Sequence, residues 1–388
     1  MDGPLHSRSK EYGVSSSEET GLRVTVYAGC RRLWFFSNEC QLRQLSAPSR
    51  RPALSRGMLP LCTGNEQNIG VWAELHGVSA RAQEVRKATP PCCDSGQSAP
   101  CQRSPLLPIS SQACTCHGLL RQNTTHVWQP YRCRLLPWNA SRFCERLGKK
   151  QLLFIGDSTM IQHHAMLVNR IVWDAQGSGG GAHDCAAQVS FVHSDTLTMA
   201  QFGRLNRGYP IRKILAGVSP HVDRWPPYDV AIVNTGAHVV SDADFKVLLH
   251  YMTKLVPSQF PLVKIVWKVQ NPAGCSHTGR PLDTPPDEQF YANHAGPTYN
   301  WRNFSRRDEL AKDAFNSAAR APQLGGVLDT APMNLRADAH ISSHGALGRP
   351  KKPGSIDCLH LCHTADGGPL ALGPQLLLHA LETRQVFF

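Results

Sequence analysis

Apolar and polar residues follow one another in blocks along residues 149–388, and these blocks predict alternating strands and helices. Residues 149–158, KKQLLFIGDS, form a short apolar run that ends in a turn. The next residues, TMIQHHAMLVNRIVWDA, have apolar side chains at helical spacing, at Met160, Ala165, Met166, Val168 and Val172. A buried strand, a tight turn and a helix in this order form the opening unit of a parallel sheet.

Three further apolar runs predict three more strands. They lie at 228–236, 262–270 and 325–332, and each is continuous rather than alternating, as strands of a parallel sheet are when both faces are buried. Helical patterns occur at 242–256, 306–321 and 369–384. The pattern predicts a doubly wound, three-layer α/β/α sandwich with a central parallel sheet. In such folds the active site lies at the carboxyl ends of the strands.

The chain before this domain has a different character, and we expect three parts in all. Residues 1–58 are polar and weakly patterned, which predicts a disordered tail. Residues 59–148 are rich in Cys, Pro and Trp with little periodicity, which predicts a small module held by disulfides. Residues 149–388 then form the α/β domain.

Cysteine usage points to an oxidising compartment. Ten of the fourteen cysteines fall in the first 144 residues, and no pair of CxxC motifs has zinc-ribbon spacing, so a disulfide framework is favoured over a metal site. Sequons at Asn123, Asn139 and Asn303 favour the secretory pathway. The first residues carry no apolar leader, and no stretch of about twenty apolar residues occurs. Either the export signal is missing from this chain or the compartment is wrong, and we favour the first.

The formal net charge of +12 predicts a surface that attracts acidic polymers. The arginines are scattered, however, and no nucleic-acid motif is present. We therefore expect no nucleic-acid partner, and an acidic polysaccharide or no particular partner is equally compatible with the charge.

Ser158 is the first candidate for chemistry. It follows the first predicted strand, in the turn before a helix, where backbone N–H groups favour an anion. A serine placed there can act as a nucleophile, with its own N–H as an oxyanion donor. The alternative is that Ser158 only caps the helix. The segment is not a G-x-S-x-G nucleophile elbow, because Met160 occupies the last glycine position.

Asp357 and His360 could supply the rest of a catalytic triad. Their spacing of three residues lets both side chains lie on one side of a turn, so that the imidazole takes the serine proton while the carboxylate orients the ring. Asn234, at the end of the strand 228–236, could donate its amide to an oxyanion, or it could only terminate the strand.

Two alternatives compete for the same residues. Cys358, Cys362 and His363 surround His360 and could hold zinc with it, although this spacing is not a common structural one. Asp338 and His340, in LRADAHIS, form a second carboxylate–imidazole pair, so local composition does not decide which histidine is the base.

These motifs together resemble a known family. FIGDS after a strand, an Asn at a later strand end and Asp-x-x-His near the C-terminus are similar to the SGNH/GDSL hydrolase superfamily. More narrowly, the chain resembles the trichome birefringence-like proteins, polysaccharide O-acetyltransferases with a PC-esterase domain. Four blocks within 59–388 carry this resemblance in the right order: LCTGNEQNIGVW (61–72), the Trp-x-Pro-x-x-Cys segment that leads into GKKQLLFIGDS (127–158), VLDTAPMNLRADAHIS (327–342) and DCLHLC (357–362).

The resemblance implies roles for individual residues. Ser158 would be the nucleophile, His360 the base and Asp357 its orienting carboxylate, with the Ser158 N–H and Asn234 in the oxyanion hole. The superfamily's other oxyanion donor has no clear match, and Gly203 and Gly208 are the candidates.

Four more residues are placed by the resemblance beside the substrate or in a supporting role. Gly156 and Asp157 precede the nucleophile, and Asp338 and His340 fall in a separate family segment, where they would line the substrate or be structural. Cys358 and Cys362 would form disulfides with more distant cysteines, and these bonds would hold the loop that contains His360. The nearest candidate partner is Cys275.

The implied reaction has two steps: Ser158 accepts an acetyl group, and a sugar hydroxyl then attacks the acyl-enzyme. The resemblance implies no bound cofactor and no metal, with acetyl-CoA or an acetylated intermediate as the acetyl donor. It also implies a polysaccharide or oligosaccharide partner, a monomer, and a place in the Golgi lumen or outside the cell. An acetyl esterase with the same triad and a catalytically silent glycan-binding module are the alternatives.

The chain departs from the family pattern at three points. Thr159-Met160-Ile161-Gln162 stands where plant members have Leu-x-Arg-Asn, and Leu361 replaces a Trp. The family's usual membrane anchor is not seen in this chain.

Overall fold

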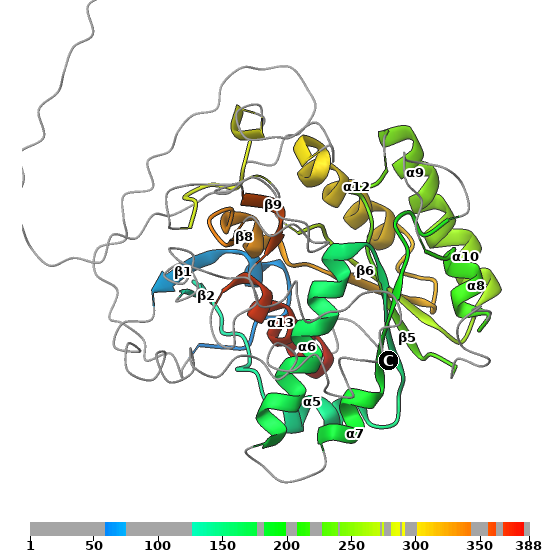
Figure 1. Ribbon diagram of the computed structural model, residues 1–388, viewed down its shortest axis with the longest axis horizontal. Helices are drawn as coiled ribbons and strands as arrows, with labels where there is room; N and C mark the ends of the chain where they lie inside the picture. The colour runs from blue at the N-terminus through cyan, green and yellow to red at the C-terminus, as the bar shows by residue number, and fades with distance from the viewer. Residues whose placement is uncertain are drawn as a thin grey trace, which may run out of the picture.

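Figure 1 shows the computed structural model of the protein. The structure describes residues 59–74, 126–176, 182–198, 208–217, 227–239, 241–271, 274, 281–287, 289–291, 301–342, 356–361 and 368–383. The predicted tail, residues 1–58, therefore lies outside the described residues, as do Asn123, Gly203, Cys275, Cys362 and His363.

The centre of the molecule is a five-stranded parallel sheet in the order β4-β3-β5-β6-β7. The strands are β3 (Leu152–Gly156), β4 (Val189–His193), β5 (Val230–Val233), β6 (Lys264–Lys268) and β7 (Leu324–Leu328). Four of them were predicted from apolar runs, and β4 was missed. Because β4 and β5 flank β3 on opposite sides, the strand order reverses at β3. The carboxyl end of β3 is therefore the expected place for a site.

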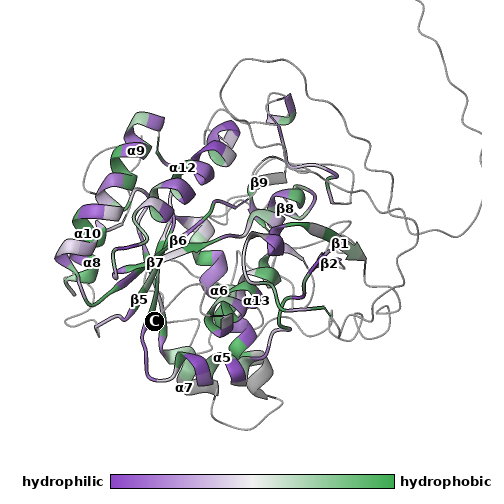
Figure 2. Ribbon diagram, turned by 180° about the vertical axis from the view of Figure 1, so that it is seen from behind, coloured by the Kyte–Doolittle hydropathy of each residue, from purple (hydrophilic) through white to green (hydrophobic). Residues whose placement is uncertain are grey.

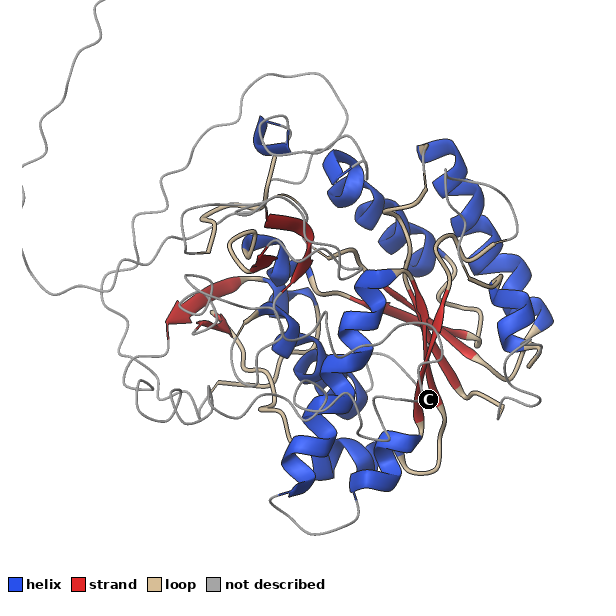
Figure 3. Cartoon of the chain, in the orientation of Figure 1, coloured by secondary structure: helices blue, strands red, loops and turns tan. Residues whose placement is uncertain are grey.

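Helices cover both faces of this sheet, which confirms the predicted three-layer α/β/α sandwich (Figure 3). One face carries α6 (Ser158–Gln176) and α13 (Pro369–Thr383), and the other carries α8 (Ile211–Leu215), α9 (Asp242–His250) and α12 (Phe304–Ser317). Along β3, Leu152 and Phe154 belong to the first hydrophobic core, and Leu153 and Ile155 to the second. This two-sided burial explains the continuous apolar runs.

The predicted helices are present, some with different limits. The helix predicted at 242–256 comprises α9, a π-helical turn (Tyr251–Leu255) and α10 (Val256–Gln259). Figure 2 shows hydrophilic and hydrophobic residues alternating along α9, α10 and α12, as expected for helices with one buried face. Two helices in 126–198 were not predicted, α5 (Ala140–Leu147) and α7 (Ala182–Ala187). No helix among the described residues is long and apolar enough to cross a membrane.

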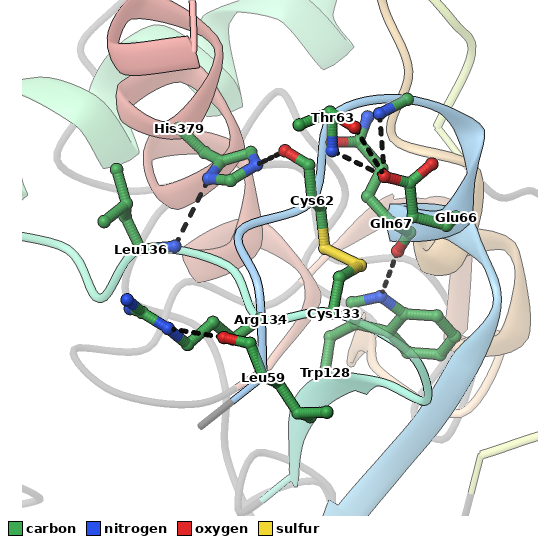
Figure 4. The surroundings of a disulfide bond; sticks show 11 residues. Leu59, Cys62, Thr63, Glu66, Gln67, Trp128, Cys133, Arg134, Leu136 and His379 are labelled. Carbon is green, nitrogen blue, oxygen red and sulfur yellow. Dashed lines mark hydrogen bonds between the residues drawn. A yellow bond between two sulfur atoms is a disulfide. The ribbon is translucent and has the colours of Figure 1, made fainter. Parts of the chain in front are cut away.

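The Cys-rich module contains an antiparallel pair of strands, β1 (Gly70–Glu74) and β2 (His126–Pro130), and a 3-10 turn, Asn65–Asn68. A disulfide joins Cys62 to Cys133 beside this pair (Figure 4). His379 of α13 contacts the same region: its Nε2 lies 2.8 Å from the Cys62 carbonyl oxygen, and its Nδ1 lies 3.3 Å from the Leu136 nitrogen. The carbonyl accepts and the Leu136 N–H donates, so the ring carries its proton on Nε2.

The module and the sheet share one hydrophobic core. The side chains of Trp72 and Trp128 belong to the same buried cluster as the residues of α6 and α13. A second disulfide, Cys144–Cys185, connects α5 to α7 across the predicted boundary at 148. The predicted disulfide framework is thus confirmed, and Cys358 is also disulfide-bonded.

The C-terminal part forms a small separate sheet beside the main one. Its strands are β8 (His340–Ser342) and β9 (Ile356–Leu361), which pair in antiparallel fashion. Two 3-10 turns, Trp301–Asn303 and Ala331–Leu335, precede α12 and follow β7. Strand β9 contacts α6, so this arrangement places the segment around His360 next to the helix that begins at Ser158.

Candidate active site

Ser158 is the first residue of α6, directly after the turn that ends β3. Asp157 caps this helix, because its Oδ1 accepts hydrogen bonds from the Thr159 N–H (2.9 Å) and the Thr159 hydroxyl (2.7 Å). The Asp157 side chain is buried, whereas Ser158 is partly exposed. The capping role that sequence reasoning allowed for Ser158 therefore falls to Asp157, and the Ser158 hydroxyl is available for another contact.

That contact is with His360. The His360 Nε2 lies 2.8 Å from the Ser158 Oγ, although the two residues are 202 positions apart in the sequence. His360 is buried in β9, with an exposed fraction of 6%. When the serine hydroxyl donates to Nε2, the ring carries its own proton on Nδ1. This is the geometry that a general base needs to remove the serine proton.

Gly156 allows the close packing next to Ser158. A Cβ at this position would lie 2.5 Å from the Asn234 carbonyl oxygen and 2.5 Å from the Met160 Cγ. Only glycine fits between β5 and the first turn of α6. Gly156 and Asp157 thus have structural functions at the turn, and their predicted contact with substrate stays a prediction.

The strand that carries His360 is held from two sides. Gln162 of α6 donates from its Nε2 to the Leu361 carbonyl (2.7 Å) and accepts from the Leu361 N–H at its Oε1 (3.0 Å). The His340 Nδ1 lies 3.0 Å from the His360 carbonyl oxygen. The backbone on the C-terminal side of the imidazole is therefore fixed by α6 and by β8.

Asp357 lies three residues before His360 in β9, where it pairs with Ile341 in the register of the small sheet. Its side chain is outside the described residues. The role of Asp357 as the carboxylate that orients His360 stays a prediction.

Asn234 directly follows β5 and is fully buried, with an exposed fraction of 0%. Its Nδ2 donates to the Lys268 carbonyl (2.7 Å), so one of its two amide hydrogens is used within the sheet. The predicted oxyanion contact would use the other hydrogen and is untested. Gly208 forms an isolated bridge with Ser194 near the end of β4, with a φ of 90°.

Asp338 and His340, the alternative carboxylate and base, each contact a further residue. Arg336 binds the Asp338 carboxylate through two hydrogen bonds, of 2.8 Å and 3.1 Å, and both side chains are fully buried. The His340 Nδ1 contacts the His360 backbone, and the His360 ring contacts Ser158. Substrate contacts of Asp338 and His340 stay predictions, and their burial favours the structural role.

A buried polar network behind the site was missed by sequence reasoning. The Lys268 Nζ, fully buried in β6, donates to the Val269 carbonyl (2.6 Å) and to the Asn271 Oδ1 (2.9 Å). The His163 Nε2 of α6 lies 2.6 Å from the same Asn271 oxygen. Burial lowers the pKa of Lys268 to about 7. Nearby carboxylates raise this pKa in part, and the largest of these opposing effects comes from Asp308. A lysine inside the apolar run LVKIVWKVQ was the available signal.

Two histidines and an aspartate lie close together at the ends of β4 and β5. The Asp195 Oδ1 is 2.7 Å from the His193 Nε2 and 3.5 Å from the His238 Nε2. The Ser194 N–H donates to the Gly156 carbonyl (2.7 Å), which connects this segment to the turn before Ser158. Within the described part of the chain, no group of three or more His, Cys, Asp or Glu side chains could hold a metal ion.

No protein-family model matches the chain. Two curated plant proteins are similar in sequence. Protein trichome birefringence-like 35 of Arabidopsis thaliana is 29% identical over 163 residues, which cover 37% of this chain and 35% of that protein. Probable xylan O-acetyltransferase 11 of Oryza sativa subsp. japonica is 25% identical over 310 residues, or 64% of this chain and 75% of that protein. The match thus spans about a third of the first relative and three quarters of the second, and both confirm the resemblance that the motifs predict.

Solved structures with a similar arrangement are distant. An active-site mutant of a family two carbohydrate esterase from Clostridium thermocellum has a TM-score of 0.32 and 11% identity, over 60% of this chain and 62% of that one. A putative arylesterase from Agrobacterium tumefaciens has a TM-score of 0.31 and 14% identity, over 61% of this chain and 100% of that one.

Proposed function

We propose that this chain, a relative of the trichome birefringence-like proteins, is an O-acetyltransferase that moves an acetyl group through Ser158 to hydroxyls of a polysaccharide. The observation that supports this most is the 2.8 Å contact between the Ser158 Oγ and the His360 Nε2. It lies at the carboxyl end of a central parallel strand, where doubly wound folds place their sites.

In the first step, the Ser158 Oγ attacks the carbonyl carbon of the acetyl donor while the His360 Nε2 accepts the hydroxyl proton. The tetrahedral oxyanion is stabilised by the Ser158 N–H and by the second amide hydrogen of Asn234. The bond to the donor then breaks, and His360 returns the proton to the leaving group. Asp357 holds the proton-bearing Nδ1 of the ring during this exchange. The products are the acetyl-serine enzyme and the free donor.

In the second step, a sugar hydroxyl gives its proton to His360 and attacks the acetyl-serine carbonyl. The Oγ–carbonyl bond breaks, Ser158 recovers its proton, and the glycan leaves as an O-acetyl ester. If water attacks instead, the product is acetate and the protein is an esterase. The two reactions use the same side chains and differ in how well water is excluded.

The acceptor we propose is a cell-wall or extracellular polysaccharide. One relative is named as a probable xylan O-acetyltransferase, and the net charge of +12 suits an acidic glycan. The disulfides Cys62–Cys133 and Cys144–Cys185 suit an oxidising compartment of the secretory pathway. We propose that the protein acts there as a monomer, with acetyl-CoA or an acetylated intermediate as donor and no bound cofactor.

The test uses the purified chain with p-nitrophenyl acetate, in the presence and absence of xylan or pectin oligosaccharides. We expect Ser158→Ala to lower the turnover number by at least about 10³-fold. The matched control is Ser258→Ala, because the exposed Ser258 hydroxyl donates to the Leu255 carbonyl. Equal release of nitrophenol by the wild type and Ser158→Ala would overturn the proposal.

Two mass measurements separate the alternatives. Intact mass after a short reaction with donor alone should show one added acetyl group on the wild type and none on Ser158→Ala. Mass spectrometry of the oligosaccharides then distinguishes the activities: acetylated sugar indicates a transferase, and free acetate with unmodified sugar indicates an esterase.

A further inference from the structure

We propose that Gln162 is a positioning residue that holds the His360 imidazole next to Ser158 by forming hydrogen bonds with the backbone of β9. This inference rests on the proposed function, because it gives Gln162 a role in the Ser158-dependent reaction. Among the described contacts, Gln162 bonds neither the Ser158 side chain nor the His360 side chain. It acts through the peptide group that follows His360.

The Gln162 side chain pairs with Leu361 as a neighbouring β-strand would. Its amide donates to the Leu361 carbonyl at 2.7 Å and accepts from the Leu361 N–H at 3.0 Å. Both residues are buried, with exposed fractions of 4% and 0%. Strand β9 is paired with β8 on its other edge. A single side chain thus satisfies two backbone groups that would otherwise be buried without partners.

The peptide group between His360 and Leu361 is held at both of its polar atoms. Its oxygen contacts the His340 Nδ1 at 3.0 Å, and its N–H donates to the Gln162 Oε1 at 3.0 Å. Because the peptide group is planar and rigid, fixing both atoms fixes the plane to which the His360 Cα is attached. The direction in which the imidazole leaves the backbone is then largely set.

Gln162 also lies on the helix that carries the nucleophile. It is four residues after Ser158 in α6, so the two side chains lie on the same face, one turn apart. The hydrogen bonds of Gln162 therefore join the element that carries the nucleophile to the element that carries the base. Without them, α6 and β9 could shift while the core on the other side of α6 stayed intact, and a shift of about 1 Å can lower a rate by roughly 100-fold.

The test replaces Gln162 with Met, which is similar in length and forms neither hydrogen bond. The matched control is Asn169→Leu, because Asn169 is another buried amide side chain on α6, with an exposed fraction of 3%, away from the site. Three quantities are measured for each: kcat and KM for p-nitrophenyl acetate, the thermal midpoint, and the rate at which an organophosphonate labels Ser158.

For Gln162→Met we expect kcat and the labelling rate to fall by about 30- to 100-fold, with KM within about twofold of the wild type. Asn169→Leu should lower the thermal midpoint but keep kcat. If Gln162→Met does not fold, Gln162→Asn is used instead. This variant keeps a buried amide, but its side chain is too short to bond both the N–H and the carbonyl of Leu361. The same loss of kcat is expected.

Two results would overturn this inference without affecting the proposed function. One is a wild-type kcat in the Gln162 variants. The other is a loss of kcat in Asn169→Leu as large as that in Gln162→Met when the two variants have the same thermal midpoint. Both leave Ser158-dependent turnover of the wild type intact. If the wild type itself shows no Ser158-dependent turnover and no labelling, the proposed function fails, and the inference fails with it.

Discussion

Replacing Asp338 with Ala separates a structural role from a substrate-binding role at this position. The Asp338 carboxylate receives two hydrogen bonds from the Arg336 guanidinium, at 2.8 Å and 3.1 Å, and neither side chain has any solvent exposure. The Arg336 guanidinium also lies over the Trp72 ring, with 4.9 Å from its carbon to the ring centroid. The ion pair therefore helps to attach the N-terminal module to the α/β domain.

The magnitude follows from the burial of both partners. Hydrogen bonds to charged groups contribute about 1.5–3 kcal/mol each, and removing one partner of a buried ion pair costs about 3–5 kcal/mol, because the other charge remains without compensation. We expect Asp338→Ala to lower the free energy of unfolding by this amount. At roughly 2–4 °C per kcal/mol, the thermal midpoint should fall by about 6–20 °C.

The assay measures unfolding in urea and, separately, kcat and KM well below the midpoint of the variant. We expect kcat and KM per folded molecule to stay close to wild type. The double variant Arg336→Met/Asp338→Leu should lose less stability than the sum of the single variants, because no charge is left unpaired. A variant that keeps its midpoint but loses activity would refute the structural role and favour substrate contact.

Three further predictions follow from burial and packing. Burial lowers the pKa of His164 to about 4, while the unfolded chain takes up this proton below about pH 6.5. Stability should therefore fall as the pH drops from 6.5 to 4, by about 2 kcal/mol at pH 5; urea unfolding should show a flatter pH dependence in His164→Gln than in the wild type. Replacing Cys144 and Cys185 with Ala opens a link across 41 positions, and thermal unfolding should report a loss of roughly 4 kcal/mol; an unchanged midpoint would contradict this. Gly156→Ala places a methyl group 2.5 Å from a backbone oxygen. We expect the free energy of unfolding to fall by about 1–3 kcal/mol, together with lower esterase activity. A variant with wild-type stability would show that the turn can adjust.

Sequence reasoning predicted the central strands that form continuous apolar runs and missed the one that is mixed. The strand β4, VSFVH, has Ser190 and His193 at its partly exposed positions, so it lacks the continuous run that revealed β3. The pair β1 and β2 was missed because 51 residues, 75–125, separate the two strands, and no turn signal joins them. The helix α5 had a recognisable start, since Asn139 caps it through the Arg142 N–H.

For the site, the family resemblance predicted Ser158 and His360 as a pair, and the structure brings their side chains together. The contacts that hold them were not predictable in the same way. Gln162 and Leu361 are 199 positions apart, and nothing in their immediate sequence indicates that one amide would pair with the other residue's backbone. Sequence periodicity reports which face of an element is buried, whereas the partner on that face depends on the packing of the whole fold.

The contacts of His379 have a consequence for how the chain is made. This side chain in the last helix bonds to the Cys62 carbonyl, 317 positions earlier, and the Trp72 indole donates to the Pro332 carbonyl, 260 positions later. At a synthesis rate of about 5–20 residues per second, roughly 15–60 s pass between the appearance of Cys62 and that of His379. During this interval the pair β1 and β2 lacks the α13 part of the core in which it is finally buried. The N-terminal module is therefore completed only after α13 has been synthesised, and the Cys62–Cys133 disulfide can form before its final packing exists.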